Sequence, residues 1–206
     1  VDIDLRYDPE IEEKQHTKEH VLDLLDLYCE NLKSLLHIPP ESSFPIYIFE
    51  KPDVNMLDNI TKDGIHIIFG INLDRVLHIM LRSKIIAEIN DIWTDLPKTN
   101  SWSDVFDERI TRGKNNWQLY GSRKPGNQAY ELKYYYTCTI DKDNKSILKE
   151  NCIKKFKITA ETLPKLSIRY KKNIEFEMNS SVNSEEYERI FNSLKYYSVY
   201  FHSYFR

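Results

Sequence analysis

Apolar and polar residues alternate over the first six positions of the chain, a pattern typical of a β-strand with one buried face. Side chains two apart on a strand share a face, so Asp2, Asp4 and Arg6 point to one side and the apolar residues to the other. From residue 15 to residue 37 the apolar residues instead recur every three or four positions. This spacing predicts an amphipathic helix that ends at the Pro39-Pro40 pair.

Further strands and helices alternate along the rest of the chain. Apolar and aromatic runs predict strands over residues 44–49, 64–69, 101–106, 130–140 and 147–158. The last two are expected to form a hairpin. A long helix is expected over residues 73–92, with Asn72 as its N-cap. A polar loop over 111–116 and a turn over 125–127 interrupt the pattern. The interleaving indicates the α/β or α+β class.

The C-terminal segment carries an aromatic stripe at helical spacing. Its helix is expected to start at Asn183 or Ser184, with Glu186 completing a capping box from Asn183. We therefore divide the chain into a domain over residues 1–178 and a helical linker or oligomerisation segment over residues 179–206. The first strand begins at residue one without an initiator Met. We expect the sequence to be an N-terminally truncated part of a longer protein.

Composition indicates a folded chain, since 41% of its 206 residues are hydrophobic. The net charge of −3 gives no basic field around the whole molecule. Acids crowd the first thirty residues and the stretch 142–172 is basic, which suits either a binding surface on one side or a solvated charged face. Cys29, Cys138 and Cys152 are few and widely spaced, which favours a reducing, intracellular setting. Neither a signal peptide nor a membrane-spanning run is present, so we expect no membrane partner.

Three acids and one histidine are the candidates for chemistry. Asp2 and Asp4 share a strand face, where two carboxylates repel each other and resist desolvation, so a divalent cation is expected to offset that cost. His66 interrupts an apolar strand, and Asp107 ends an apolar run. Plainer explanations exist for each: a solvent-facing strand edge for the two acids, a satisfied core residue for the histidine, and a turn or cap for Asp107.

The order of these positions carries a resemblance. An acid-x-acid strand, a small-x-His strand and an apolar run that ends in Asp resemble the three motifs of the archaeo-eukaryotic primase superfamily. Residues 62–66 (Lys-Asp-Gly-Ile-His) resemble the second motif. Residues 116–125 (Asn-Trp-Gln-Leu-Tyr-Gly-Ser-Arg-Lys-Pro) are similar to the segment after the third motif in primase–helicases of large DNA viruses, of the poxvirus type, and in eukaryotic primase-polymerases. The resemblance covers residues 1 to about 140.

The resemblance implies an RRM-like mixed sheet flanked by helices, followed here by a C-terminal helical extension. It implies two Mg²⁺ or Mn²⁺ ions held by Asp2, Asp4 and Asp107, with His66 as a further catalytic residue. The residues that it implies for the incoming nucleotide are Lys62, Gly64, His66, Arg123 and Lys124. Relatives often carry Ser at the position of Gly64, which here offers a backbone N–H instead. Gln118 stands where relatives carry a basic residue, and no zinc-ligand set accompanies the domain.

Template contacts are expected from the C-terminal third of the chain. Six basic residues there suit the phosphates of single-stranded DNA: Lys154, Lys155, Lys157, Arg169, Lys171 and Lys172. Tyrosines 134–136 or Trp117 would stack on bases. The alternative is that the tyrosines alternate between core and surface and that the basic side chains are merely solvated.

The function implied by the resemblance is that of a DNA-dependent primase or primase-polymerase, which makes primers from nucleoside triphosphates by two-metal phosphoryl transfer. It also implies an ATP-hydrolysing, hexameric helicase in the rest of the protein and a place at the site of viral DNA replication in the host cell. The chain itself contains no Walker-type P-loop. Two alternatives stay open, a catalytically inactive nucleic-acid-binding module of the same fold and a metal-dependent nuclease. The lack of a His-x-His pair argues against a rolling-circle initiator.

Overall fold

The computed structural model describes residues 1–112, 117 and 120–203, with side chains described up to residue 195. Its strands are β1 (Asp2–Tyr7), β2 (Leu36–His37), β3 (Ser43–Glu50), β4 (Asn55–Leu57), β5 (Ile60–Phe69), β6 (Ile71–Asn72), β7 (Glu131–Ile140), β8 (Ser146–Glu150), β9 (Ile174–Glu175) and β10 (Glu177–Met178). Its α-helices are α1 (Lys18–Leu35), α2 (Arg75–Glu88), α3 (Trp102–Val105), α4 (Glu108–Thr111) and α5 (Ser184–Ser203). Short 3-10 helices are η1 (Ile89–Asp91), η2 (Ile153–Lys155) and η3 (Leu163–Leu166).

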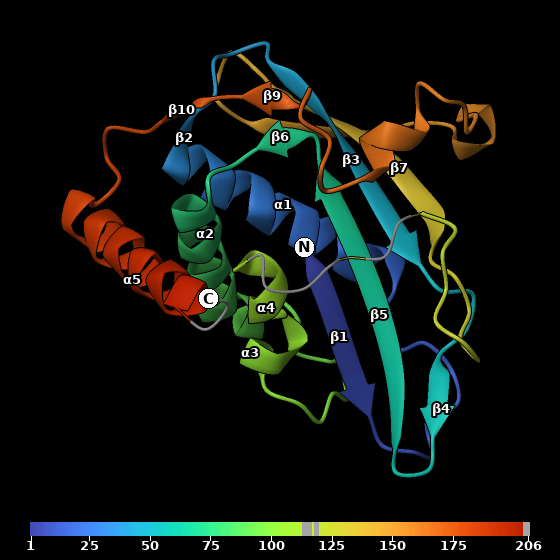
Figure 1. The fold of residues 1–206 in the computed structure, drawn as a ribbon. Coiled ribbons are helices and arrows are strands. Elements are labelled where there is room, and N and C mark those ends of the chain that lie inside the picture. Colours follow the sequence, from blue (N-terminus) through green and yellow to red (C-terminus); the bar gives the residue numbers. More distant parts are fainter. Residues whose placement is uncertain (113–116, 118–119, 204–206) are drawn as a thin grey trace.

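A single antiparallel sheet forms the centre of this α+β fold (Figure 1). Its strands lie in the order β1-β5-β3-β7-β8, and β4 pairs with the first residues of β5. The α+β class is confirmed, but the expected mixed character of the main sheet is wrong. Tight connections from β4 to β5 and from β7 to β8 impose antiparallel pairing. Within the described residues, parallel pairing is confined to the short contact of β6 with β9.

The main core lies between one face of the sheet and the helices α1 and α2. The alternation in β1 works as predicted, because Ile3, Leu5 and Tyr7 are fully buried on the core side. The helix α1 begins after Thr17, whose side-chain hydroxyl accepts the backbone N–H of His20 at 3.3 Å. Burial of these apolar faces supplies the main driving force for the fold.

A smaller aromatic layer covers part of the opposite face of the sheet. Tyr47 stacks on Tyr135 with 5.0 Å between ring centroids, and Phe156, from the segment after β8, contacts both rings. Tyr136 points the other way and is buried in the main core. The run 134–136 therefore alternates between the two sides of the sheet, as one of the two explanations held, with Tyr136 buried and Tyr134 and Tyr135 half-buried. Stacking of the half-buried rings on bases stays a prediction.

The segment before Asp107 differs from its prediction as a strand. Ser101 instead caps the short helix α3, because its hydroxyl accepts the N–H of Asp104 at 3.2 Å and this local bond competes with a sheet ladder.

The N-cap of α2 is also a different residue from the one predicted. Asp74, rather than Asn72, caps this helix by accepting the N–H of Leu77 at 2.9 Å, and α2 with η1 spans 75–91.

The hairpin of β7 and β8 forms as expected, but its second strand ends at Glu150 and does not extend to residue 158. Asn151 still donates its N–H to the Tyr135 carbonyl of β7 at 2.8 Å, and the chain then turns into η2. The turn over 125–127 is confirmed, since the Asn127 N–H donates to the Lys124 carbonyl at 3.0 Å. Most of the loop expected over 111–116 lies outside the described residues.

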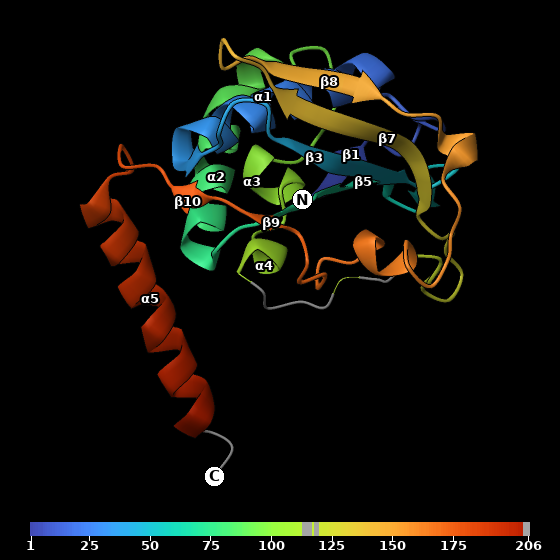
Figure 2. The same ribbon diagram turned by 90° about the horizontal axis from the view of Figure 1, so that it is seen from above.

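The C-terminal helix α5 begins where the sequence predicts, because the Asn183 side chain accepts the N–H of Glu186 at 3.1 Å. It contacts α2 and projects from the body of the molecule (Figure 2). None of the described helices combines the length and the apolarity that crossing a membrane requires.

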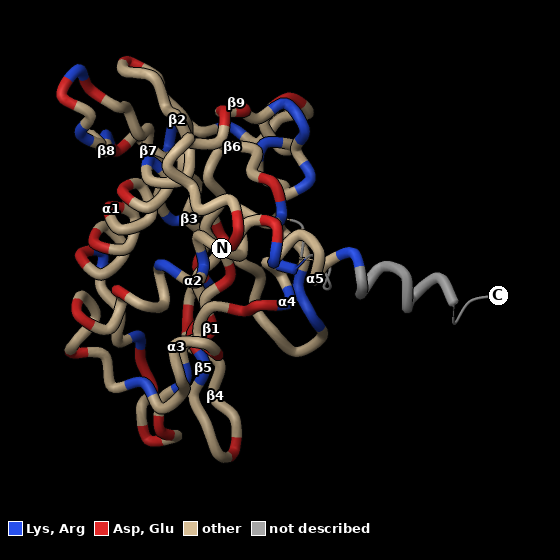
Figure 3. The backbone as a smooth tube through the Cα atoms, turned by 90° about the vertical axis from the view of Figure 1, so that its left-hand side faces the viewer, with Lys and Arg blue, Asp and Glu red and all other residues tan. Residues whose placement is uncertain are grey.

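Acidic and basic residues gather on different sides of the molecule. The charged residues of α1 are mostly acidic, and basic residues gather beyond β9 on the other side of the view (Figure 3).

Candidate active site

The register between β1 and β5 places the first two motifs directly opposite each other. Asp2 pairs with His66, Asp4 with Gly64, and Arg6 with Lys62. Because paired residues of an antiparallel ladder share a face, these side chains emerge on the side of the sheet away from the main core. The contact between the motifs is therefore a consequence of strand pairing.

The third motif reaches the same place along the outer edge of β1. Phe106 forms an isolated bridge with Ile3, and the Asp107 N–H donates to the Asp2 carbonyl at 3.3 Å. Arg82 of α2 holds this segment through two bonds, from Nε to the Phe106 carbonyl and from Nη2 to the Ser103 carbonyl, each 2.8 Å long. Asp107 thus follows a bridge residue that a core helix fixes in place.

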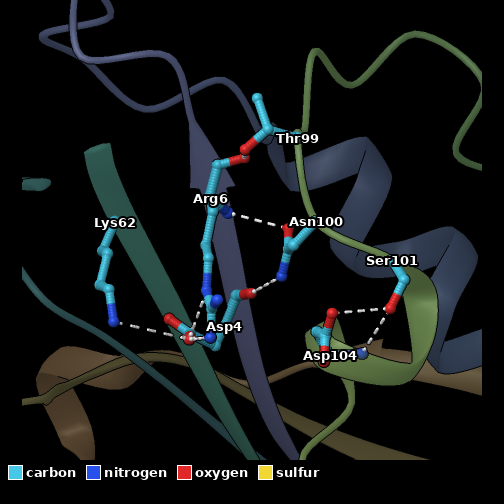
Figure 4. Close-up of polar contacts among 7 residues, drawn as sticks. All are labelled: Asp4, Arg6, Lys62, Thr99, Asn100, Ser101 and Asp104. Carbon is cyan, nitrogen blue, oxygen red and sulfur yellow. Dashed lines mark hydrogen bonds and ion pairs between the residues drawn. The ribbon is translucent and has the colours of Figure 1, made fainter. Parts of the chain in front are cut away.

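The rest of the β1 edge is held by the loop before α3 (Figure 4). Asn100 imitates a neighbouring strand, since its Nδ2 donates to the Asp4 carbonyl at 2.8 Å and its Oδ1 accepts the Arg6 N–H at 3.2 Å. The Thr99 N–H adds a bond of 2.7 Å to the Arg6 carbonyl. These contacts satisfy an otherwise open strand edge beside the acids.

A cleft of about 850 Å³ opens between these elements and the segment before β7. Its lining includes the three aspartates Asp2, Asp4 and Asp107 together with His66. Lysines and aromatic residues complete the lining, among them Lys51, Lys62, Lys124, Trp117 and Tyr130. The size falls in the range of small-molecule sites, and both acidic and basic residues line it.

His66 lines the cleft in a crowded aromatic environment. Its ring stacks on Tyr130 with 3.6 Å between centroids and lies 4.3 Å from the Trp117 ring. Its Nε2 is 3.2 Å from the Trp117 indole nitrogen and 3.1 Å from Oδ1 of Asp2. The indole N–H can only donate and the carboxylate can only accept, so the two contacts belong to different proton positions on the ring. Burial lowers the pKa of His66, against the opposing effect of Asp2.

Cations crowd the side of the cleft near Asp4. The Asp4 carboxylate accepts from Arg6 at 3.2 Å and lies 4.0 Å from Nζ of Lys62. Burial lowers the pKa of Lys51, and the neighbouring charge of Lys124 lowers it further. These ammonium groups therefore repel one another in the cleft, which favours an anionic ligand.

The three aspartates do not form a ready-made metal site. Across the part of the chain that the structure describes, no group of three or more His, Cys, Asp and Glu side chains is placed to hold a metal ion. Asp2 contacts His66, Asp4 pairs with Arg6, and Asp107 caps α4 by accepting the N–H of Arg109 at 2.8 Å. The oxygen donors are nonetheless of the hard type that Mg²⁺ takes, so the donor chemistry fits such an ion.

The sequence of residues 1–136 matches the family model described as the C962R protein N-terminal AEP domain, where AEP denotes archaeo-eukaryotic primase. This match spans well over half of the chain. The chain belongs to this family. No curated protein matches it. The AEP domain is thus a primase-type domain of the large-DNA-virus primase–helicase family, as the order of the motifs indicated, and such domains generally depend on divalent metals.

Most nucleotide-site residues predicted for the AEP domain line the cleft, but one does not. Lys62, Gly64, His66 and Lys124 all line it, whereas Arg123 is exposed and lines a surface hollow over 123–128. The residues proposed for DNA contact are all exposed and lie outside the cleft: Lys154, Lys155, Lys157, Arg169, Lys171 and Lys172. Gln118 lies outside the described residues.

Two residues that line the cleft of the AEP domain were not predicted as site residues from the sequence. Lys51 follows directly after β3, and Tyr130 directly precedes β7. Neither belongs to one of the three motifs, and each reaches the cleft through long-range strand pairing. The sequence shows only that each is a basic or aromatic residue at the end of a strand. Many positions of the chain share this property, so it does not identify a cleft residue.

Proposed function

We propose that this AEP domain synthesises primers on single-stranded DNA from nucleoside triphosphates. The proposal rests on one observation. Asp2, Asp107 and His66 line one cleft, and several lysines line the same cleft. Phosphoryl transfer needs little covalent chemistry from a protein and depends mainly on positioning and on compensating negative charge. The cleft offers both, carboxylates for cations and ammonium groups for phosphates.

The carboxylates of Asp2, Asp4 and Asp107 would hold the divalent ions. Mg²⁺ uses only one or two protein carboxylates besides water and substrate phosphates, so an incomplete protein cage suits it. When bound, two such ions supply activation of the attacking 3′-hydroxyl and stabilisation of the leaving oxygen. The chain prepares the site beforehand, because Asn100 and Arg82 hold the backbone that carries the acids.

The triphosphate would lie toward Lys51, Lys62 and Lys124, with His66 beside it. Charge-assisted hydrogen bonds from ammonium groups to phosphate oxygens are about twice as strong as neutral ones. A bound triphosphate would also offset the burial and the neighbouring charge of Lys124, which together lower the pKa of Lys51. This assignment gives Lys51 a role that the motifs do not contain.

Single-stranded DNA would contact the exposed basic residues of the segment between β8 and β9, which include Lys154, Lys155 and Lys157. Their exposure supports backbone contact without sequence reading. The hexameric helicase, the viral replication site and the boundary at residue 178 stay predictions.

The test is template-directed incorporation of labelled nucleotide by the purified chain with Mn²⁺ and single-stranded DNA, comparing wild type with Asp107→Asn. Asn caps helices as well as Asp does, so this variant keeps the bond to Arg109 and loses only the charge. We expect incorporation to fall by roughly 10²-fold or more, the scale of losing one electrostatic contact to the transition state. The matched control is Asp74→Asn, which changes the capping aspartate of α2 away from the cleft.

Three outcomes separate the candidate functions, and a fourth tests the assignment of Asp107. Loss of incorporation in Asp107→Asn alone supports the proposal. Degradation of DNA without added nucleotide would favour a nuclease. A wild-type chain that binds DNA but neither extends nor degrades it would favour an inactive binding module, and equal incorporation by both variants would reject the assignment of Asp107.

A further inference from the structure

Tyr130 lies over the strand that carries the second motif. Its ring stacks on His66 with an interplanar angle of 18°, and Nζ of Lys51 stands 5.2 Å from the ring centroid on the cleft side of β3. These contacts fix the position of the phenol ring. The hydroxyl at its far end therefore has a defined place in the cleft.

Gly64 lies directly beneath that hydroxyl. A Cβ built on Gly64 would overlap the Tyr130 hydroxyl oxygen and would stand 3.2 Å from the ring carbon Cζ. The backbone φ of Gly64 is not in the left-handed region, so its conformation does not require glycine. Close approach of the tyrosine is the reason for glycine here. The Tyr130 hydroxyl occupies the space that a side chain at position 64 would fill.

The hydroxyl has an unused capacity to bind a ligand. Among the residues that the structure describes, it makes no hydrogen bond, although it lines a polar cleft. A phenol is neutral at physiological pH and carries one O–H donor. Lys51, Lys62 and Lys124 line the same cleft, so the ligand that would accept this proton is an anion.

We propose that Tyr130 is a nucleotide-binding residue whose hydroxyl, seated over Gly64, donates a hydrogen bond to a phosphate oxygen of the incoming triphosphate. The inference rests on the proposed function of the cleft and deepens it. Gly64 and Tyr130 act as a pair, in which the missing side chain of one makes room for the donor of the other.

The first experiment removes only the hydroxyl. Tyr130→Phe keeps the ring on His66 and beneath Lys51, and Tyr134→Phe is the matched control because Tyr134 packs toward the main core. Dissociation constants are measured for ATP and dATP with Mn²⁺ and for inorganic tripolyphosphate. We expect Tyr130→Phe to weaken all three by roughly tenfold or more, the scale of a hydrogen bond to a charged group. Affinity for single-stranded DNA should not change.

The second experiment tests the pairing. Gly64→Ser in the wild-type background forces the serine Cβ against the Tyr130 hydroxyl, so we expect weaker nucleotide binding and a lower Tm. The same Gly64→Ser change combined with Tyr130→Phe removes the overlapping oxygen, leaves only the 3.2 Å approach to the ring carbon Cζ and restores a hydroxyl, so most of the lost affinity should return. A purely structural role of Tyr130 also predicts recovery once the overlap is removed, so the control is Gly64→Ala combined with Tyr130→Phe, which lacks both hydroxyls. Equal recovery of nucleotide affinity in the two double variants would overturn the role of the hydroxyl.

The outcomes distinguish this inference from the function on which it rests. If the wild-type chain incorporates nucleotide while Tyr130→Phe binds all three ligands as tightly as wild type, only the role of Tyr130 is overturned. A loss confined to ATP and dATP, with tripolyphosphate unaffected, would overturn the phosphate contact. A wild-type chain that binds no triphosphate would overturn both proposals.

Discussion

A buried histidine behind the cleft ties three elements together and makes the stability of the domain depend on pH. Nδ1 of His16 is 2.6 Å from Oδ2 of Asp63 on β5, and its Nε2 is 3.3 Å from Oε1 of Glu50 on β3. Nζ of Lys14 is 2.9 Å from the other oxygen of Glu50 and 3.9 Å from Oδ1 of Asp63. His16, Glu50 and Asp63 are all buried, so removing one partner leaves charge that water cannot reach.

The direction of the pH dependence follows from two shifted groups. Burial lowers the pKa of His16, but hydrogen bonds and charge from Asp63 and Glu50 outweigh it and raise that pKa from 6.5 to about 9. Burial would raise the pKa of Glu50, yet hydrogen bonds to His16 and Lys14 bring it to about 2. The His16 contribution is complete below pH 6.5 and disappears as the pH rises through 9. The Glu50 contribution is complete above pH 4.5 and disappears as the pH falls through 2.

The perturbation is His16→Gln, which keeps hydrogen-bonding atoms but cannot carry the charge. At about 1.36 kcal/mol per pKa unit, the raised pKa of His16 corresponds to about 3 kcal/mol. Breaking a buried ion pair typically costs about 3–5 kcal/mol. We therefore expect the variant to be less stable than wild type by about 3 kcal/mol or more at pH 6, and this gap to shrink by about 3 kcal/mol by pH 9.

Urea unfolding followed by circular dichroism at pH 6, 7, 8 and 9 measures the gap. Titrating groups that do not contact His16 cancel in the difference between variant and wild type. Tyr7 faces Asp63 from β1, but burial raises its pKa, so it stays neutral throughout. His37→Gln is the matched control because His37 is exposed, and it should change the free energy of unfolding little at any pH. A gap between His16→Gln and wild type that stays constant from pH 6 to pH 9 would refute the charged state of His16.

Two further predictions concern positioning and template binding. Arg82→Ala removes both bonds to the segment before Asp107, so we expect nucleotide incorporation to fall and stability to drop by about 1–3 kcal/mol. Arg75→Ala on the same helix is the control, and equal activity of the two variants would contradict the role of Arg82. Changing Lys154, Lys155 and Lys157 together to Gln should reduce the salt slope of single-stranded DNA binding by about 2. The same change at Lys142, Lys145 and Lys149 should leave the slope unaltered, and an equal effect of both triples would show no preference for the first segment.

Local patterns were sufficient for the elements whose cause is local. The alternation in residues 1–6 predicted the faces of β1, and the helical spacing after residue 15 predicted α1. The start of α5 could be predicted for the same reason, because the Asn183 side chain caps the first turn by accepting the N–H of a residue only three positions further on. Segment 101–106 failed as a strand because its apolar spacing is equally compatible with one helical turn, and Ser101 decided between them.

The site could be predicted only as a set of motifs, and its geometry needed the fold. Nothing within residues 1–6 or 62–66 states that Asp2 lies opposite His66, because register depends on pairing between segments sixty residues apart. Lys51 and Tyr130 reach the cleft through β3 and β7 for the same reason. The metal-binding set stays a prediction, since the three aspartates line one cleft but are paired with other groups.

Successive side chains of β5 point to opposite sides of the sheet, so this strand contributes both to the cleft and to the buried side. Lys62, Gly64 and His66 face the cleft, so Asp63 between them must face the core, where His16 holds it. A one-residue slip of β5 would exchange the two sets, burying a lysine and bringing Asp63 among the cleft acids. The buried charge network opposes that slip, because Asp63 would lose the partner that offsets its desolvation. Asp63 is not among the residues proposed to bind the nucleotide, but its burial favours the register that places Lys62, Gly64 and His66 on the cleft face.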